Sequence, residues 1–341
     1  MKRIIRAIVI FSVLAVSLFS ASAFAAEDAS DEGQLQGLER IENIVYGKVN
    51  TGGLLLRLSR VERDLFGMEL PGSLTEREHA LEKFVLSGSA SQPPLFFKMG
   101  VAEWITLKKV NSALPLQERV EKLETLIEDR TQSGALSARL ERVIAKLMPN
   151  GVSSVSVTVP SNTVFSAKFV ETLSVRNVKK GDKIALELDE DSIINGALIA
   201  ARGGRLFAYI TDVKLPRTFG RASEIRIEFR EVEFLDGNIT GVFIGSEAKK
   251  AMNIDSATVG AAGASLAGAV IAGPLGLASG LLVRGNDKQI KEGTEVFVET
   301  SEASAVLGYG NISVSEPQPL SNSDASPMSP SGGETNTETF Q

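Results

Sequence analysis

Apolar residues in the first half of the chain recur at helical spacing. Leu54, Leu58, Val61 and Leu65 stand at i, i+4, i+7 and i+11, with Glu and Arg between them. On an α-helix these four positions lie on one face. A helix of about twelve residues is only marginally stable alone in water. The pattern therefore predicts an amphipathic helix that packs against neighbours.

This pattern repeats about every 20 residues. Its copies cover residues 38–57, 59–77, 116–127 and 133–147. Glycines close the copies at positions that are typical of helix C-caps. We therefore predict helical 20-residue repeats over residues 34–148. The interruption at 86–115 should hold a loop and then a short element anchored by Phe96, Phe97 and Trp104.

The apolar face of these repeats has two interpretations. It is either the core of an ordinary intramolecular bundle or the coiled-coil-like seam of a spacer or oligomerisation arm. Glycine-containing turns every 20 residues break any long coiled coil. The sequence leaves both alternatives open.

In the second half the patterning becomes alternating and β-rich, as in KIALELD and EIRIEFREVEFL. Turn signals separate these runs. They include Lys180-Gly181-Asp182, Arg202-Gly203-Gly204 and Asp236-Gly237-Asn238. We predict a β domain over residues 152–310, a small antiparallel β-barrel or sandwich, with a hairpin turn at Asp236-Gly237. The fold class is therefore α+β.

One stretch of the β domain, residues 256–283, carries no charge, and we call it the glycine-rich segment. Small residues recur there at every fourth position. They are Gly260, Ala264, Gly268, Ala272, Gly276 and Gly280. On a helix this spacing makes a flat stripe for close helix packing, so we predict a glycine zipper used for helix packing or oligomerisation.

Gly273-Pro274 breaks the glycine-rich segment, so we expect an inserted helical hairpin rather than one spanning helix. The hairpin is either inserted in a membrane and self-associating, or packed on the β domain. A flexible apolar loop is the third alternative.

The two ends of the chain have the composition of processing and tail segments. Residues 1–25 combine a positive start, an apolar run and the A-x-A site Ala23-Phe24-Ala25. This combination predicts a secretory signal peptide cleaved near Ala25. Residues 315–341 are rich in Ser, Pro and Thr, so we predict a disordered tail.

The composition of the chain excludes several kinds of site and partner. The chain carries a net charge of −6 and has no cysteine, so disulfides and thiolate metal sites are excluded. An acidic chain without a basic aromatic patch argues against nucleic acid as a partner. No sequence motif for a nucleotide, metal or catalytic triad occurs, so we expect neither cofactor nor metal.

Two candidate polar sites have simpler explanations. The acidic run Glu187, Asp189, Glu190 and Asp191 lacks the glycine and the spacing of a calcium loop, so we expect a solvated strand end. His79 is the only histidine and stands among charged residues of a repeat helix, where we expect it on the surface.

The β half also resembles a known family. The order of its segments resembles the periplasmic β-barrel domain of type IV secretion outer-membrane core components, and uncharacterised exported bacterial glycine-zipper proteins. The resemblance covers residues 155–300. The segments that carry it are Phe165–Val175, Gly181-Asp182, Asn195–Thr211, Gly220–Phe229, Asp236-Gly237 and Gly293–Glu299. It implies a β-barrel or sandwich with an inserted helical element.

These observations together predict an exported, non-enzymatic structural or assembly protein of the cell envelope. We expect it to self-associate or to bind a membrane through the glycine-rich segment, in the periplasm or at the outer membrane. The alternative is a soluble periplasmic or surface module that binds an envelope protein or a cell-wall glycan such as peptidoglycan. An enzyme would need carboxylates alone, and none can be selected from the sequence.

Overall fold

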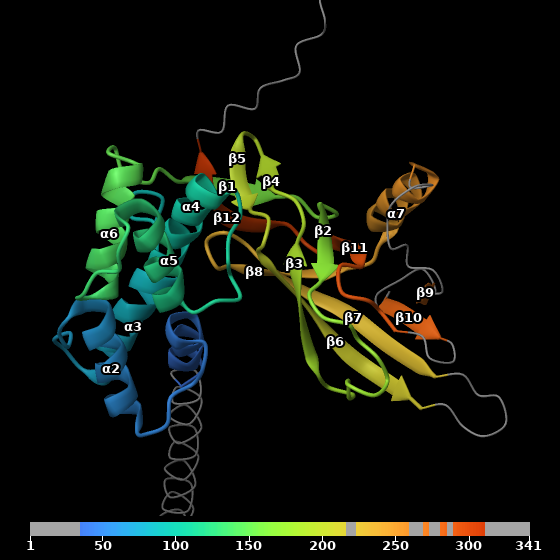
Figure 1. Cartoon of the computed structure of the whole chain (residues 1–341), viewed down its shortest axis with the longest axis horizontal. Helices are drawn as coiled ribbons and strands as arrows, with labels where there is room; N and C mark the ends of the chain where they lie inside the picture. The colour runs from blue at the N-terminus through green and yellow to red at the C-terminus, as the bar shows by residue number, and fades with distance from the viewer. Residues whose placement is uncertain (1–34, 216–222, 259–268, 273–279, 285–288, 311–341) are drawn as a thin grey trace, which may run out of the picture.

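The computed structural model describes residues 35–215, 223–258, 269–272, 280–284 and 289–310 of the 341-residue chain. A helical half precedes a β half, and the two lie side by side (Figure 1). The predicted α+β class is confirmed. The signal peptide and the tail at 315–341 lie outside the described residues and stay predictions.

The helical half consists of short helices of similar length. Residues 35–46 are helical. The helices that follow are α2 (Leu54–Phe66), α3 (Leu74–Val85), α4 (Leu95–Leu107), α5 (Leu116–Glu128) and α6 (Leu136–Leu147). Gly67 ends α2 in the left-handed region at φ 79°, as expected of a C-cap glycine. The predicted helical repeats are confirmed.

The interruption of the repeat contains a complete helix. The short element predicted there is α4, which is as long as α2, at 13 residues. Its sequence loses the amphipathic pattern because most of its residues are buried. Phe96 packs in the helical core, whereas Phe97 packs in a separate cluster with Leu198 and Leu235 of the β half. A helix covered on several sides needs no polar face.

The apolar stripe of the repeats is core. Leu58, Val61 and Leu65 of α2 are at most 1 % exposed and share one cluster with Leu123 and Leu140. The intramolecular bundle is therefore the correct interpretation of this face. A seam between separate chains would leave the stripe open in one chain.

Buried ion pairs connect successive helices. Their Glu and Arg residues stand between the apolar positions of the repeats, where an amphipathic helix predicts a polar, exposed face. In each pair a Glu contacts an Arg 15 or 16 residues later. The pairs are Glu42–Arg57 at 2.6 Å, Glu62–Arg77 at 2.5 Å, Glu103–Arg119 at 2.8 Å and Glu124–Arg139 at 2.7 Å. We call each of them a Glu–Arg clasp.

Each clasp also closes the loop between its two helices. The Glu carboxylate accepts a hydrogen bond from the backbone N–H eight residues later. The donors are Asn50, Leu70, Asn111 and Gln132, at 3.2, 3.3, 2.9 and 3.0 Å. A buried charge is tolerated when it is paired and hydrogen-bonded in this way.

The β half is built from twelve strands and one helix among the described residues. The strands are β1 (Val155–Val159), β2 (Val164–Phe169), β3 (Lys183–Leu188), β4 (Ser192–Ile194), β5 (Ala197–Ala200), β6 (Arg205–Lys214), β7 (Glu224–Glu233), β8 (Ile239–Phe243), β9 (Ala269–Ala272), β10 (Gly280–Arg284), β11 (Glu295–Thr300) and β12 (Ser304–Gly310). Helix α7 (Ser246–Thr258) lies between β8 and β9.

Six of these strands close a barrel in the order β6-β3-β2-β11-β8-β7, with β7 paired back to β6. All of these pairings are antiparallel. Phe165, Phe169, Phe229 and Phe234 fill its core. A second sheet, β1-β12-β5-β4, lies toward the helical half. The predicted β-barrel is confirmed.

The hairpin turn predicted at Asp236-Gly237 is present between β7 and β8. Glu233 pairs with Ile239, and Gly237 has φ 83°, which favours glycine. A Cβ at Gly237 would also approach Phe96 to 3.1 Å. The turn therefore packs tightly against α4.

The helical form expected for the glycine-rich segment is wrong wherever the structure describes residues after α7. Ala269–Ala272 and Gly280–Arg284 are the antiparallel strands β9 and β10, and β10 pairs with β7. Strand pairing satisfies the backbone groups along the edge of β7.

Candidate functional site

The glycine-rich segment remains the candidate site, now as an extension of the barrel sheet. Ala272 of β9 lies directly opposite Gly280 of β10. Gly260, Ala264, Gly268 and Gly276 lie outside the described residues. The structure therefore brings two of the six predicted residues together, as a cross-strand pair and not along a helix face.

The barrel places this hairpin far from the helical repeats. β10 pairs with the first half of β7, through Leu281–Ile227 and Val283–Ile225, whereas β8 pairs with the second half of β7. In Figure 1, α7, β9 and β10 lie on the side of the barrel opposite the helical half. β9 is the last strand of the described sheet order.

Helix α7, which leads into the segment, is attached to the barrel by Glu299 of β11. This side chain is 2 % exposed and accepts a 2.7 Å hydrogen bond from the N–H of Ala248 in the first turn of α7. A carboxylate there complements free N–H groups and the positive helix end. A Cβ at Gly245 would overlap the Glu299 carboxylate, so only glycine fits. No sequence motif marked these residues.

Among the residues that the structure covers, no helix is both long and apolar enough to cross a bilayer.

The acidic run belongs to the joint between the two halves. Asp191 accepts hydrogen bonds from Trp104 Nε1 at 2.7 Å and from the N–H of Arg202 at 2.8 Å. Asp189 pairs with Lys168 at 2.7 Å. Glu187, Glu190 and Asp191 are exposed at and just after the end of β3, as expected of a solvated strand end, and two of the four carboxylates in addition make specific bonds.

His79 lies exposed on α3, as expected. Within the described ranges, no group of three His, Asp or Glu residues is arranged to hold a metal ion.

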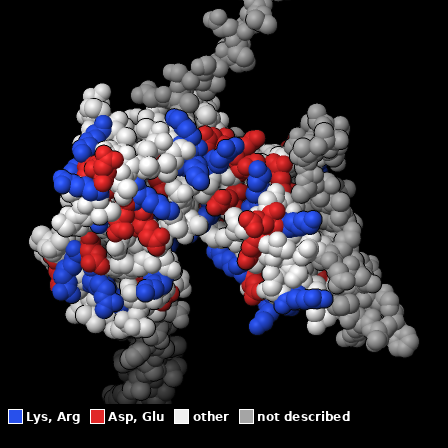
Figure 2. Space-filling view, in the orientation of Figure 1, with Lys and Arg blue, Asp and Glu red and all other residues white. Residues whose placement is uncertain are grey.

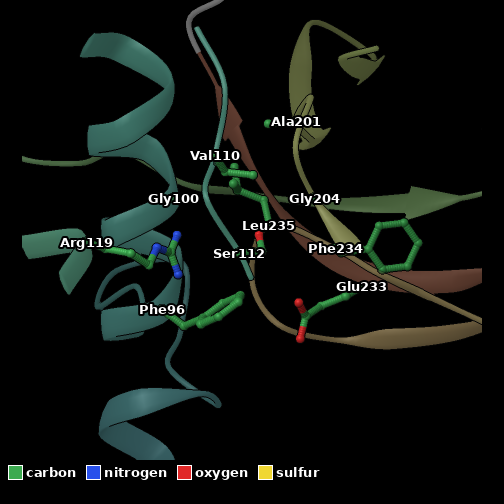
Figure 3. Close-up of a pocket in the computed structure, with 10 residues that line it drawn as sticks. All are labelled: Phe96, Gly100, Val110, Ser112, Arg119, Ala201, Gly204, Glu233, Phe234 and Leu235. Atoms are coloured by element: carbon green, nitrogen blue, oxygen red, sulfur yellow. The ribbon is translucent and has the colours of Figure 1, made fainter. Parts of the chain in front are cut away.

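A small void lies in the seam between the halves, and Figure 3 shows the side chains that line it. The void is about 10 Å³, lined by Phe96 and Arg119 from the helical half and by Glu233 and Leu235 from the barrel. A water molecule needs about 10–15 Å³ of such space. This void is too small for a substrate.

The pKa values of two buried carboxyl groups, Glu78 and Asp236, are raised. Burial raises the pKa of Asp236, although the N–H groups of Leu307 and Asn238 donate to it at 2.7 and 3.0 Å. Burial, and then the Glu82 carboxylate, raise the pKa of Glu78 to about 7. Asp236 joins the hairpin turn to β12, which is a structural role.

Charges of both signs are interspersed on the face of the molecule in Figure 2. Basic and aromatic side chains do meet on the outside of the barrel, where Lys183 lies 3.8 Å from the centroid of Phe207. Glu231 pairs with Lys183 at 3.1 Å. The basic groups there are thus partly neutralised, which does not favour a polyanion.

No protein-family model matches this chain, and no curated protein matches it significantly. The resemblance to type IV secretion core components and to exported glycine-zipper proteins stays a prediction.

Proposed function

We propose that this protein is a non-enzymatic structural or assembly component of the bacterial cell envelope. In this proposal it is exported by its N-terminal leader, and the glycine-rich segment associates with a membrane, such as the outer membrane, or with further copies of the chain. The protein needs no cofactor for this role.

One observation carries the proposal. A charge-free segment leaves the barrel between β8 and β11, on the side opposite the helical repeats, and its described parts extend the sheet from β7. In this position the strands β9 and β10 lie away from the contacts that join the two halves of the molecule.

The strand conformation changes how association would work. An edge strand presents backbone N–H and C=O groups that pair with another strand. β9 has the sequence AVIA and ends the described sheet. We therefore favour pairing of copies through β9, at or in a membrane, over packing of glycine-striped helices.

Fractionation with crosslinking tests the proposal. Membranes from the native host are washed with sodium carbonate, and the intact protein is crosslinked in parallel. We expect the full-length chain to stay in the pellet or to give a ladder of multimers. Release of the chain by carbonate would contradict membrane association, and a crosslinked sample that contains only monomer would contradict self-association. Both results together would reject the proposal.

A charged substitution shows whether the glycine-rich segment is responsible. Ile271→Asp places a charge in β9, whereas Ile239→Asp does so at an exposed residue of β8 and serves as the control. A charge in the bilayer costs about 2.5–3.5 kcal/mol, which is roughly 100-fold in partition. Only Ile271→Asp should abolish pelleting or the ladder, with circular dichroism confirming that both variants fold.

A further inference from the structure

The helical repeats contain one junction without a Glu–Arg clasp. The clasp uses an Arg as the fourth residue of one helix and a Glu that stands 15 or 16 residues before it in the preceding helix. Between α3 and α4 these positions are Lys98 and Glu82. Lys98 instead contacts Glu141 of α6 at 2.5 Å, and Glu82 forms no ion pair with any described residue. A lysine lacks the planar fork that binds a carboxylate through two hydrogen bonds.

A groove of about 850 Å³ lies at this broken junction. It runs between α3, the loop before α4, and α6 with the segment that follows α6. Ligand pockets in proteins typically have volumes of about 300–1,000 Å³. The groove is thus large enough for a short oligomer, unlike the void at the seam between the halves.

The loop that walls the groove is held in place. Ser89 and Gln92 exchange backbone hydrogen bonds of 2.8 and 3.0 Å. The Ser154 hydroxyl, just before β1, donates to the carbonyl of Ala90 at 2.9 Å. A Cβ at Gly88 would collide with the backbone of Gln92. A turn tied at both sides keeps the groove open without a ligand.

The side chains along the groove indicate the chemistry of its ligand. Gln92 and Asn150 offer amides, which both donate and accept hydrogen bonds. Phe84 is half-buried and supplies an apolar ring, while Lys83 is exposed and forms no ion pair with a described residue. Glu141 neutralises Lys98, so the groove keeps one positive charge, that of Lys83.

This combination favours a sugar over a peptide. Amides match sugar hydroxyls, an aromatic ring packs on the C–H face of a pyranose, and a lysine pairs with a carboxylate. A peptide that binds by β-strand addition pairs with the edge of a sheet. The main walls here are the helices α3 and α6, whose backbone groups are bonded within each helix.

We propose that the groove between α3 and α6 binds an acidic oligosaccharide, with Lys83 on a ligand carboxylate and Phe84 against a sugar ring. This inference goes beyond the assembly role. It does not depend on the glycine-rich segment, so either proposal can fail without the other.

Titration calorimetry on the purified full chain tests the site with three probes: trigalacturonate, neutral maltotriose and an acidic Glu-Glu-Glu peptide. We expect trigalacturonate to bind, and maltotriose to bind at least about tenfold more weakly because it lacks the carboxylates. Binding of the peptide alone, or of no probe, would overturn the proposal. So would equal binding of the two sugars.

Variants locate the binding. Lys83→Gln should weaken trigalacturonate binding at least about tenfold, and Ser91→Trp should block the groove sterically. Lys122→Gln removes a charge from an exposed residue of α5 outside the groove and should bind as the wild type does. Unchanged binding by both groove variants would overturn the assignment.

Discussion

At the scale of residues, the Glu–Arg clasps decide how successive helices pack. The Glu103 side chain is 1 % exposed and that of Arg119 is 2 % exposed. Arg119 also lies 5.6 Å from the centroid of Phe96. Each group therefore depends on the other for neutralisation, which makes loss of one partner more damaging than loss of both.

Arg119→Met is expected to destabilise the protein by about 3–5 kcal/mol, because Glu103 is left buried and uncompensated. Urea unfolding measures this loss. The double variant Glu103→Leu/Arg119→Met should recover more than about 1 kcal/mol of it. Lys250→Met, at an exposed pair with Glu247, should change stability by less than about 1 kcal/mol. No recovery in the double variant would refute the clasp.

Glu78 gives the folded protein a pH dependence. Its pKa is raised from 4.5 to about 7 by burial and by Glu82. The folded state therefore binds the Glu78 proton more tightly than the unfolded state does. The protonated carboxyl stabilises the fold at low pH, and this contribution to the free energy of unfolding is lost as pH rises from about 4.5 to about 7. Glu78→Gln should remove that part of the decline, measured as unfolding free energy at pH 5 and pH 8. Parallel pH profiles for the two proteins would contradict the prediction.

At the scale of elements, α7 and the β9–β10 hairpin depend on two contacts with the barrel. Glu299 holds the first turn of α7, and β7 provides the edge on which β10 pairs. Both contacts come from residues distant in the sequence. The position of the glycine-rich segment is therefore set by the barrel and not by the segment itself.

Glu299→Gln should loosen α7, because a neutral amide is a weaker acceptor at a helix N-terminus. We expect faster hydrogen exchange at Ala248, corresponding to about 0.5–2 kcal/mol of lost protection. Glu295→Gln lies in the same strand, where Glu295 accepts from Ser166, and serves as the control. Equal exchange in both variants would show that Glu299 does not hold the helix.

At the scale of the whole molecule, the halves are joined by a mixed seam. Trp104 donates to Asp191 and meets Tyr309 of β12 edge-on, with ring centroids 6.1 Å apart. The N–H of Val110 donates to the carbonyl of Arg202 at 2.8 Å. A void of only about 10 Å³ remains, so we expect the halves to unfold together.

Trp104→Ala should uncouple the halves and split one calorimetric unfolding transition into two. Trp104→Phe keeps the ring contact and loses only the hydrogen bond to Asp191, at a cost of about 1 kcal/mol. Trp104 is the only tryptophan, so its fluorescence reports directly on the seam. Leu126→Ala, at a residue 57 % exposed, is the control and should unfold like the wild type. A single transition in Trp104→Ala would contradict this prediction.

Much of the fold followed from local patterns. Leu54, Leu58, Val61 and Leu65 fall on one face of a helix, and Asp236-Gly237 forms a hairpin turn, because both signals act over a few residues. The clasps were harder to foresee. The recurring Arg57 and Glu62 looked like a polar face, and only the partner helices bury them.

The sequence by itself determined the repeat, the β patterning and the α+β class, because the spacing of apolar residues dictates which face each element buries. The tertiary structure alone decided the conformation of β9 and β10, since Gly, Ala and Val in that segment are compatible with either helix or strand and the edge of β7 selects the strand. It also decided where the groove opens. Whether Lys98 binds Glu82 or Glu141 depends on the distance between helices that lie far apart in the chain.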